Sequence, residues 1–233
     1  MKAILAAALA LIALACAGTA AAQSMNLAPG FQSLPKGAKV AIMPTDIELF
    51  VISAGGVVEP KADWTESASM HFKEALLKKR EALGFTAVEL TAKQADEADE
   101  INALHGAISR AIAMHHFGPL RLPTKDGKLD WSMGDSVQSI KQATGADYAL
   151  FSFVRDSYAS GERKAAMVAI ALLTLGRAAL ALGTQSGYAS LVDLNTGRVV
   201  WFNQLLRATG DLREPESAAE TLDALLREFP LAK

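Results

Sequence analysis

Four histidines are the side chains of this sequence best suited to binding a metal ion. They are His71, His105, His115 and His116, and imidazole is the commonest metal ligand in proteins. Adjacent His115 and His116 would point about 100° apart on a helix, which is a poor chelating geometry. His71 and Glu74 are three residues apart beside an apolar stripe. We interpret the four as surface residues, and the sequence predicts neither a metal site nor a cofactor.

Nucleophilic and phosphate-binding sites depend on short motifs that present an activated hydroxyl or a cradle of backbone N–H groups. Gly-x-Ser-x-Gly, Gly-x-x-x-x-Gly-Lys-Ser/Thr and Gly-x-Gly-x-x-Gly do not occur in this sequence. Ser33 and Lys36 have the spacing of a Ser-x-x-Lys pair, but the intervening Pro35 lies outside any predicted helix. The sequence therefore predicts a protein that is not an enzyme and has no catalytic residue.

Paired carboxylates suggest the alternative that this chain is an enzyme. Asp46 and Glu48 are two residues apart on a predicted strand and could share one face, and glycosidases use a pair of carboxylates as acid and base. We interpret them as solvated acids on an edge strand. The alternative is a hydrolase in which Asp46, Glu48, Glu59 and His71 converge in one cleft.

Apolar periodicity predicts the elements that position these side chains. Strands are expected at residues 39–43, 47–52, 85–90, 148–154, 188–194 and 199–205, and helices at 63–83, 95–114, 135–144 and 217–229. Residues 148–154 are apolar on both faces, which is typical of a central strand. Asn195-Thr196-Gly197 predicts a hairpin turn. We expect a single α/β domain with a mixed sheet flanked by helices, a C-terminal hairpin and a terminal helix.

The first residues have the three-part layout of a signal peptide. Lys2 precedes an apolar stretch, and small residues end at Ala22. We expect a signal peptide at 1–22, a flexible tether at 23–38 and the domain at 39–233. Cys16, the only cysteine, follows Ala13-Leu14-Ala15, which is similar to a lipoprotein box. Lipidation at Cys16 is therefore the alternative to cleavage after Ala22, and the prediction is a periplasmic protein or an outer-membrane lipoprotein.

An apolar insertion at residues 163–183 is the most informative segment. As a helix, its stretch from Ala165 to Leu182 would be about 27 Å long, close to the thickness of a bilayer. Arg177 opposes burial in lipid. Three roles follow, of which packing on its own domain comes first, contact with a protein or a membrane surface second, and a membrane span last. The candidate interface residues are Met167, Ile170, Leu173, Thr174, Arg177 and Leu180.

Three motifs connect the chain to a known group of proteins. They are Val40-Ala41-Ile42-Met43-Pro44, Thr144-Gly145-Ala146-Asp147-Tyr148-Ala149-Leu150, and the run from Leu191 to Trp201 that contains Asp193-Leu194-Asn195-Thr196-Gly197. With the signal sequence, they resemble envelope proteins related to the curli-secretion lipoprotein CsgG, the penicillin-binding-protein activators and the amino-terminal domain of the Tol-system β-propeller protein. The resemblance implies a small periplasmic α/β module. It also implies a non-catalytic role in building or regulating the envelope through protein contacts.

Two features depart from that group. Ser152 stands where a glycine is common, and the apolar insertion precedes the hairpin. Secretion channels of the group need β-hairpins with about ten alternating residues per strand, and the sequence contains no such pair. We therefore expect an envelope assembly or accessory protein that contacts another envelope protein or a second copy of itself. A small-ligand carrier with a pocket beneath the Ala-rich helix is a further alternative. The formal net charge of −2 excludes nucleic acid as a partner.

Overall fold

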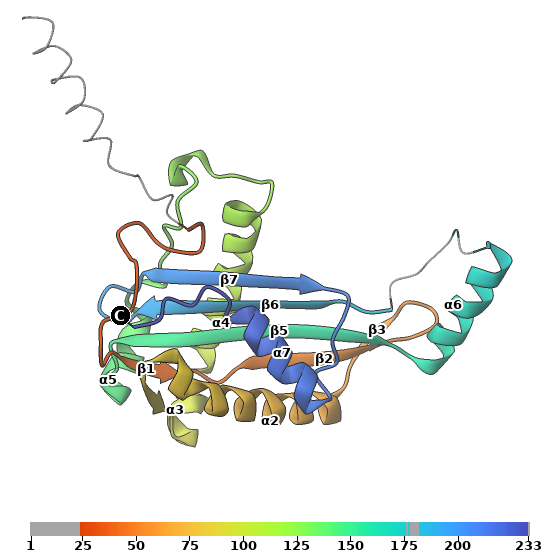
Figure 1. Cartoon of the computed structure of the whole chain (residues 1–233), viewed down its shortest axis with the longest axis horizontal. Coiled ribbons are helices and arrows are strands. Elements are labelled where there is room, and N and C mark those ends of the chain that lie inside the picture. Colours follow the sequence, from red (N-terminus) through yellow and green to blue (C-terminus); the bar gives the residue numbers. More distant parts are fainter. Residues whose placement is uncertain (1–23, 176, 178–181, 233) are drawn as a thin grey trace, which may run out of the picture.

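A seven-stranded mixed sheet with helices on both faces forms the body of the protein (Figure 1). The computed structural model describes residues 24–175, 177 and 182–232. These features confirm the predicted α/β class, with its C-terminal hairpin and terminal helix. The strands are β1 (Lys39–Ile42), β2 (Asp46–Ile52), β3 (Val58–Pro60), β4 (Thr86–Glu89), β5 (Tyr148–Ala159), β6 (Gln185–Asp193) and β7 (Val199–Arg207). The helices are α2 (Ala62–Lys79), α3 (Ala92–Glu97), α4 (Asp99–Ile112), α5 (Gln138–Thr144), α6 (Gly161–Leu173) and α7 (Pro215–Leu225). The short 3₁₀ helices are η1 (Arg80–Leu83), η3 (Pro123–Lys125) and η4 (Gly134–Val137), and η2 (Ala113–Phe117) is a π-helix that follows α4.

Strand β5 is the centre of the sheet, as its apolar sequence predicts. β6 pairs with one edge of β5, and β1 and β2 pair one after the other with the opposite edge. Ile42 lies beside Leu150, and Asp46 lies beside Phe153. From Ile42 to Asp46 the chain advances four residues, whereas β5 advances only three over the same distance. β1 and β2 therefore behave as one strand with a bulge at Pro44. β4 extends the sheet beside β1, and β3 extends it beside β2.

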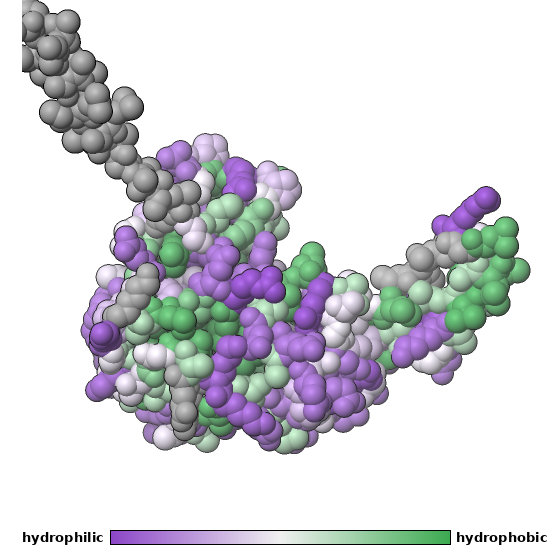
Figure 2. Space-filling model, in the orientation of Figure 1, coloured by the Kyte–Doolittle hydropathy of each residue, from purple (hydrophilic) through white to green (hydrophobic). Residues whose placement is uncertain are grey.

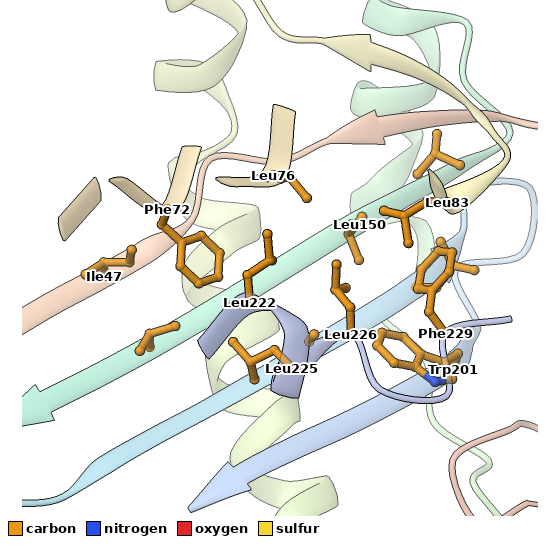
Figure 3. Packing of buried hydrophobic residues seen from close by; sticks show 14 of the residues in the cluster. Ile47, Phe72, Leu76, Leu83, Leu150, Trp201, Leu222, Leu225, Leu226 and Phe229 are labelled. Carbon is orange, nitrogen blue, oxygen red and sulfur yellow. The ribbon is translucent and has the colours of Figure 1, made fainter. Parts of the chain in front are cut away.

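Alternation along the strands divides the interior into two cores. Val40 and Leu150 face α2 and α7, whereas Ala41 and Ala149 face α4 and α5. In the first core, Phe72 lies near Leu222 between helices and sheet, and Trp201 lies beside Phe229 further along the sheet, as Figure 3 shows with the other residues of this core. Successive strand residues point to opposite faces, so a strand covered on both sides needs apolar residues on both faces, which β5 supplies from Ala149 to Phe151 and at Phe153 and Val154.

Residues 24–38 do not form the flexible tether that the sequence predicts. The Ala28 amide donates to the Val200 carbonyl oxygen at 2.9 Å, and the Phe202 amide donates to the Asn26 carbonyl oxygen at 2.9 Å. Leu34 is only 1% exposed and belongs to the first core. The segment therefore covers the outer edge of β7, and the folded domain begins before Lys39. Its prolines and glycines allow the turns but do not prevent packing.

Two predicted helices also differ in their ends. The helix expected at 95–114 is divided at Ala98 into α3 and α4, and a capping box formed by Thr91 and Gln94 starts α3 earlier than predicted. The helix expected at 217–229 begins at Pro215 and ends at Leu225. Phe229 still reaches the first core, where its ring packs against Trp201 with centroids 5.2 Å apart. The apolar pattern therefore identified residues that are buried, although some of them lie beyond the helix.

Replacing Phe72 tests the packing of α2 on the sheet. Phe72 is 0% exposed, so Phe72→Ala should leave a cavity and lower the free energy of unfolding by about 3–5 kcal/mol. Met70 on the same helix is 55% exposed, and Met70→Ala should change that free energy by less than about 0.5 kcal/mol. Urea denaturation measures both. Equal losses in the two variants would contradict the packing described here.

Candidate functional site

Helix α6 extends away from the sheet at the end of β5 (Figure 1). The Ser160 amide donates to the Ile52 carbonyl oxygen at 2.9 Å, which ties the start of the helix to β2. The Ser160 hydroxyl accepts from the Arg163 amide at 3.2 Å and caps the helix. At the other end, the Thr174 hydroxyl donates to the Ile170 carbonyl oxygen at 2.8 Å. We call the described segment from Gly161 to Leu175 the α6 arm.

The α6 arm presents apolar side chains to solvent. No residue of helix α6 is buried, and Leu172, Leu173 and Leu175 are 73%, 84% and 84% exposed. Figure 2 shows apolar atoms over the end of this projection, which stands apart from the main body. The expectation that the insertion packs on its own domain is therefore wrong for α6. Among the described residues, no helix has the length and hydropathy that a membrane span requires.

The predicted interface residues take different positions on the α6 arm. Leu173 is exposed, whereas Met167, Ile170 and Thr174 are half-buried. Arg177, just beyond the arm, is exposed, and Leu180 lies outside the described residues. The sequence analysis missed Val168, Leu172 and Leu175, all of them largely exposed. Their spacing of four and three residues is that of a helical stripe, and this signal could have identified them.

A cavity of about 380 Å³ lies at the base of the α6 arm, beside Lys164 and Leu182. Its buried carboxylate, Asp156, accepts from the Tyr158 hydroxyl at 2.6 Å and from the Gln185 side-chain amide at 2.6 Å. The Ser157 amide donates to its other oxygen at 2.8 Å. Burial raises the pKa of Asp156, and these three hydrogen bonds oppose the rise. Both oxygens are thus occupied by the protein, which makes this carboxylate a structural tie between β5 and β6.

Arg213 closes the same region from the side of α2. Its guanidinium lies 4.5 Å from the Trp64 ring centroid and 4.2 Å from the Tyr158 ring centroid. Arg213 Nε donates to Asp211 at 2.7 Å, and this pairing lowers the pKa of the Asp211 carboxyl. Stacking of this kind between a cation and aromatic faces stabilises packing. Asp211 and the two aromatic rings therefore hold the Arg213 guanidinium in place at this cavity.

The four residues of the hydrolase alternative do not meet in one cleft. Arg155 pairs with Asp46 at 2.8 Å and with Glu48 at 3.3 Å. Glu59 lies beside Val51, which is five residues from Asp46 along β2, so Glu59 and Asp46 are about 16 Å apart along the strand. The His71 ring lies against the Leu212 carbonyl oxygen, with Nδ1 at 3.4 Å. Asp46 and Glu48 do share a face as predicted, but as partners of one arginine.

Two of the four histidines are buried, which corrects the expectation that all lie on the surface. His105 is 2% exposed, and its Nε2 lies 2.9 Å from the Ser190 hydroxyl and 3.0 Å from the Ser109 hydroxyl. His116 is 3% exposed and bonds to the Met25 carbonyl oxygen at 2.8 Å. Within the described ranges, no cluster of three His, Cys, Asp or Glu side chains could hold a metal ion.

Comparison with known proteins gives similar structures only. No family model matches the chain, and no curated protein matches it. The PelC dodecamer from Paraburkholderia phytofirmans is 16% identical over 86% of this chain and 93% of that chain, with a TM-score of 0.39. The LpoB C-terminal domain from Salmonella enterica is 14% identical over 77% and 87%, with a TM-score of 0.30. Lipoprotein GNA1162 from Neisseria meningitidis is 15% identical over 72% and 81%, with a TM-score of 0.30. The resemblance to CsgG stays a prediction.

His105 should make the stability of this protein depend on pH. Burial lowers its pKa from 6.5 to about 3, so the folded protein keeps this imidazole neutral while the unfolded chain binds a proton below pH 6.5. The contribution of the neutral His105 side chain to the free energy of unfolding is fully present above pH 6.5 and is lost as the pH falls toward 3. At pH 4 the loss from this group is about 3 kcal/mol.

The variant His105→Gln removes this titration. Urea denaturation at pH 7 and pH 4 should show that the variant loses about 3 kcal/mol less than the wild-type protein between the two pH values. Whatever stability the substitution costs at pH 7 cancels in this difference. Equal losses in both proteins would show that the folded state protonates His105 as readily as the unfolded chain does.

Proposed function

We propose that this chain is an exported, non-catalytic envelope protein that assembles with or assists another protein through contacts made by the α6 arm. The observation that carries the proposal is the exposure of Leu172 and Leu173 on helix α6, which has no buried residue, and of Leu175 in the turn that follows the helix. Burying one such side chain is worth about 1.5–3 kcal/mol. Contiguous exposed apolar surface marks interaction sites, and a partner that covered the arm would recover this free energy.

The proposed address is the periplasm. It is supported by the signal-like layout before Gln23 and by the motifs that resemble envelope proteins. Cleavage after Ala22 would release the protein, whereas lipidation at Cys16 would anchor it at the outer membrane. The proposed partner is an envelope protein or a second copy of this chain. A membrane surface is the alternative partner, and the net charge of −2 argues against nucleic acid.

The proposed absence of catalysis rests on how the acidic side chains are used. Asp46 and Glu48 are held by Arg155, and Asp156 is held by three donors. A general acid or base must be free to exchange a proton with a substrate within hydrogen-bond reach. Carboxylates that are already paired suit a structural role better than proton transfer.

Photo-crosslinking from the α6 arm tests the proposed function. A photoreactive amino acid at Leu173 in the full chain, activated in intact cells, should give covalent adducts with an envelope protein or with a second copy. The same residue at Leu120, which is 58% exposed outside the arm, should give none of these adducts. Mass spectrometry identifies the products. Adducts with lipid alone, or the same adducts from both positions, would contradict a protein-binding arm.

A double substitution tests the leucines themselves. Leu172→Ser with Leu173→Ser should reduce recovery of the crosslinked partner from a photoreactive residue at Val168 about tenfold or more, because two apolar contacts are lost. The free energy of unfolding should change by less than about 0.5 kcal/mol, since both side chains are exposed. Leu120→Ser is the matched control and should leave recovery unchanged. Unchanged recovery with the double variant would remove these leucines from the contact.

A further inference from the structure

A second cavity, of about 390 Å³, lies at the edge of the sheet where β4 ends. Glu89, the last residue of β4, lies beside Ile42, and the next strand on this edge is β3, whose Pro60 lies beside Phe50. The edge between Ile42 and Phe50 therefore has no neighbouring strand along the bulge at Pro44. The cavity occupies this notch and is far along the sheet from α6 (Figure 1).

The helices around the notch lie on opposite faces of the sheet. The chain reaches β4 through α2, which packs in the first core with Phe72 and Leu76. It leaves β4 through Leu90 and the short helix α3, which has no buried residue, toward α4, which packs in the second core with Ile101. In open α/β sheets, ligands bind outside the carboxyl ends of strands where the connections change face. The volume also lies within the range of small-molecule pockets, roughly 300 to 1,000 Å³.

The walls of the cavity are polar at one end and apolar at the other. α2 runs back along β2 and β1, since the Thr65 hydroxyl accepts from the Leu49 amide at 3.0 Å near the start of the helix. Because the helix runs opposite to the strands, early residues of α2 lie near late residues of the β1–β2 segment, and late residues of α2 lie near β1. Thr45 faces the part of α2 that carries Ser69 and Lys73 at the polar end. At the other end, the cavity is lined by Ile42, Met43, Leu76, Leu77 and Leu90.

Lys73 is the available cation at the polar end. Its side chain is exposed, and no described residue forms an ion pair with it. The ammonium group carries three donors and no acceptor. The Thr45 hydroxyl lies 2.8 Å from the Ser152 hydroxyl and can donate to a ligand when Ser152 donates to it. Glu89 on the rim is exposed and lies beside Ile42, at the apolar end of the cavity and away from Thr45 and Ser69.

We propose that this cavity binds a small amphipathic anion. The anionic head would lie at Lys73 and Thr45, and a short hydrocarbon tail would lie against Leu76, Leu77 and Leu90. The carboxylate of a medium-chain fatty acid has this chemistry. The site is separate from the α6 arm, so the inference does not rest on the function proposed above.

Calorimetric titration of the full chain with decanoate tests the site. One molecule of decanoate should bind per chain, and Lys73→Glu should weaken binding about tenfold or more, because a charge-assisted hydrogen bond is lost and a repulsion is gained. Lys78 is exposed on the same helix but does not line the cavity. Lys78→Glu changes the net charge equally and should keep the wild-type affinity.

Filling the cavity is the second arm of the test. Ala92 is exposed on the wall that α3 forms, so Ala92→Trp should abolish decanoate binding while circular dichroism shows an unchanged fold. Leu172→Ser with Leu173→Ser should bind decanoate as the wild-type protein does, which distinguishes this site from the apolar arm. The proposal is overturned if Ala92→Trp binds normally, if only the arm variant loses binding, if decanoate does not bind, or if decyltrimethylammonium binds equally well.

Discussion

Burial of β5 on both faces and along both edges is the constraint on which the rest of this structure depends. Residues Ala149 to Val154 are all buried, with α2 and α7 on one side and α4 and α5 on the other. A strand in this position must pair all its backbone groups, because an unpaired buried N–H or C=O group is costly. β6 satisfies one edge, and β1 with β2 satisfies the other.

The far half of β5 explains the α6 arm. From Arg155 onward partly exposed residues interrupt the burial of the strand, and none of them belongs to the second core. Asp156 and Tyr158 fasten this end to β6 and to the loop before α7, through Gln185 and the Leu212 amide at 2.7 Å. β5 is thus a rigid base that ends beyond the cores. Among the described residues, the helix that starts there contributes none that is buried, and the leucines at its far end remain exposed.

The polar groups inside the protein serve packing. His105 stacks on Phe151 with centroids 4.8 Å apart and shares its nitrogen with two serine hydroxyls. Buried polar groups that are fully hydrogen-bonded stabilise one arrangement of a core. Of the surfaces formed by the described residues, we assign binding to two, the apolar end of the α6 arm and the notch beside β4. The arm protrudes and suits a large partner, whereas the notch is concave and suits a small ligand.

The sequence by itself determined the elements whose signals are local. The apolar run of β5, the Asn195-Thr196-Gly197 turn and the stripe of α2 predict structure from neighbouring residues, because strand and helix periods are set by backbone geometry. Tertiary structure decided which apolar surfaces are covered. The same residue types occur in α6 and in buried helices, so composition could not show that Leu173 is exposed. Arg155 lies 109 residues from Asp46, and only the pairing of β2 with β5 brings that arginine to the carboxylates. Residues 24–38 became part of the domain for the same reason, because the edge of β7 offered backbone partners that no local pattern reveals.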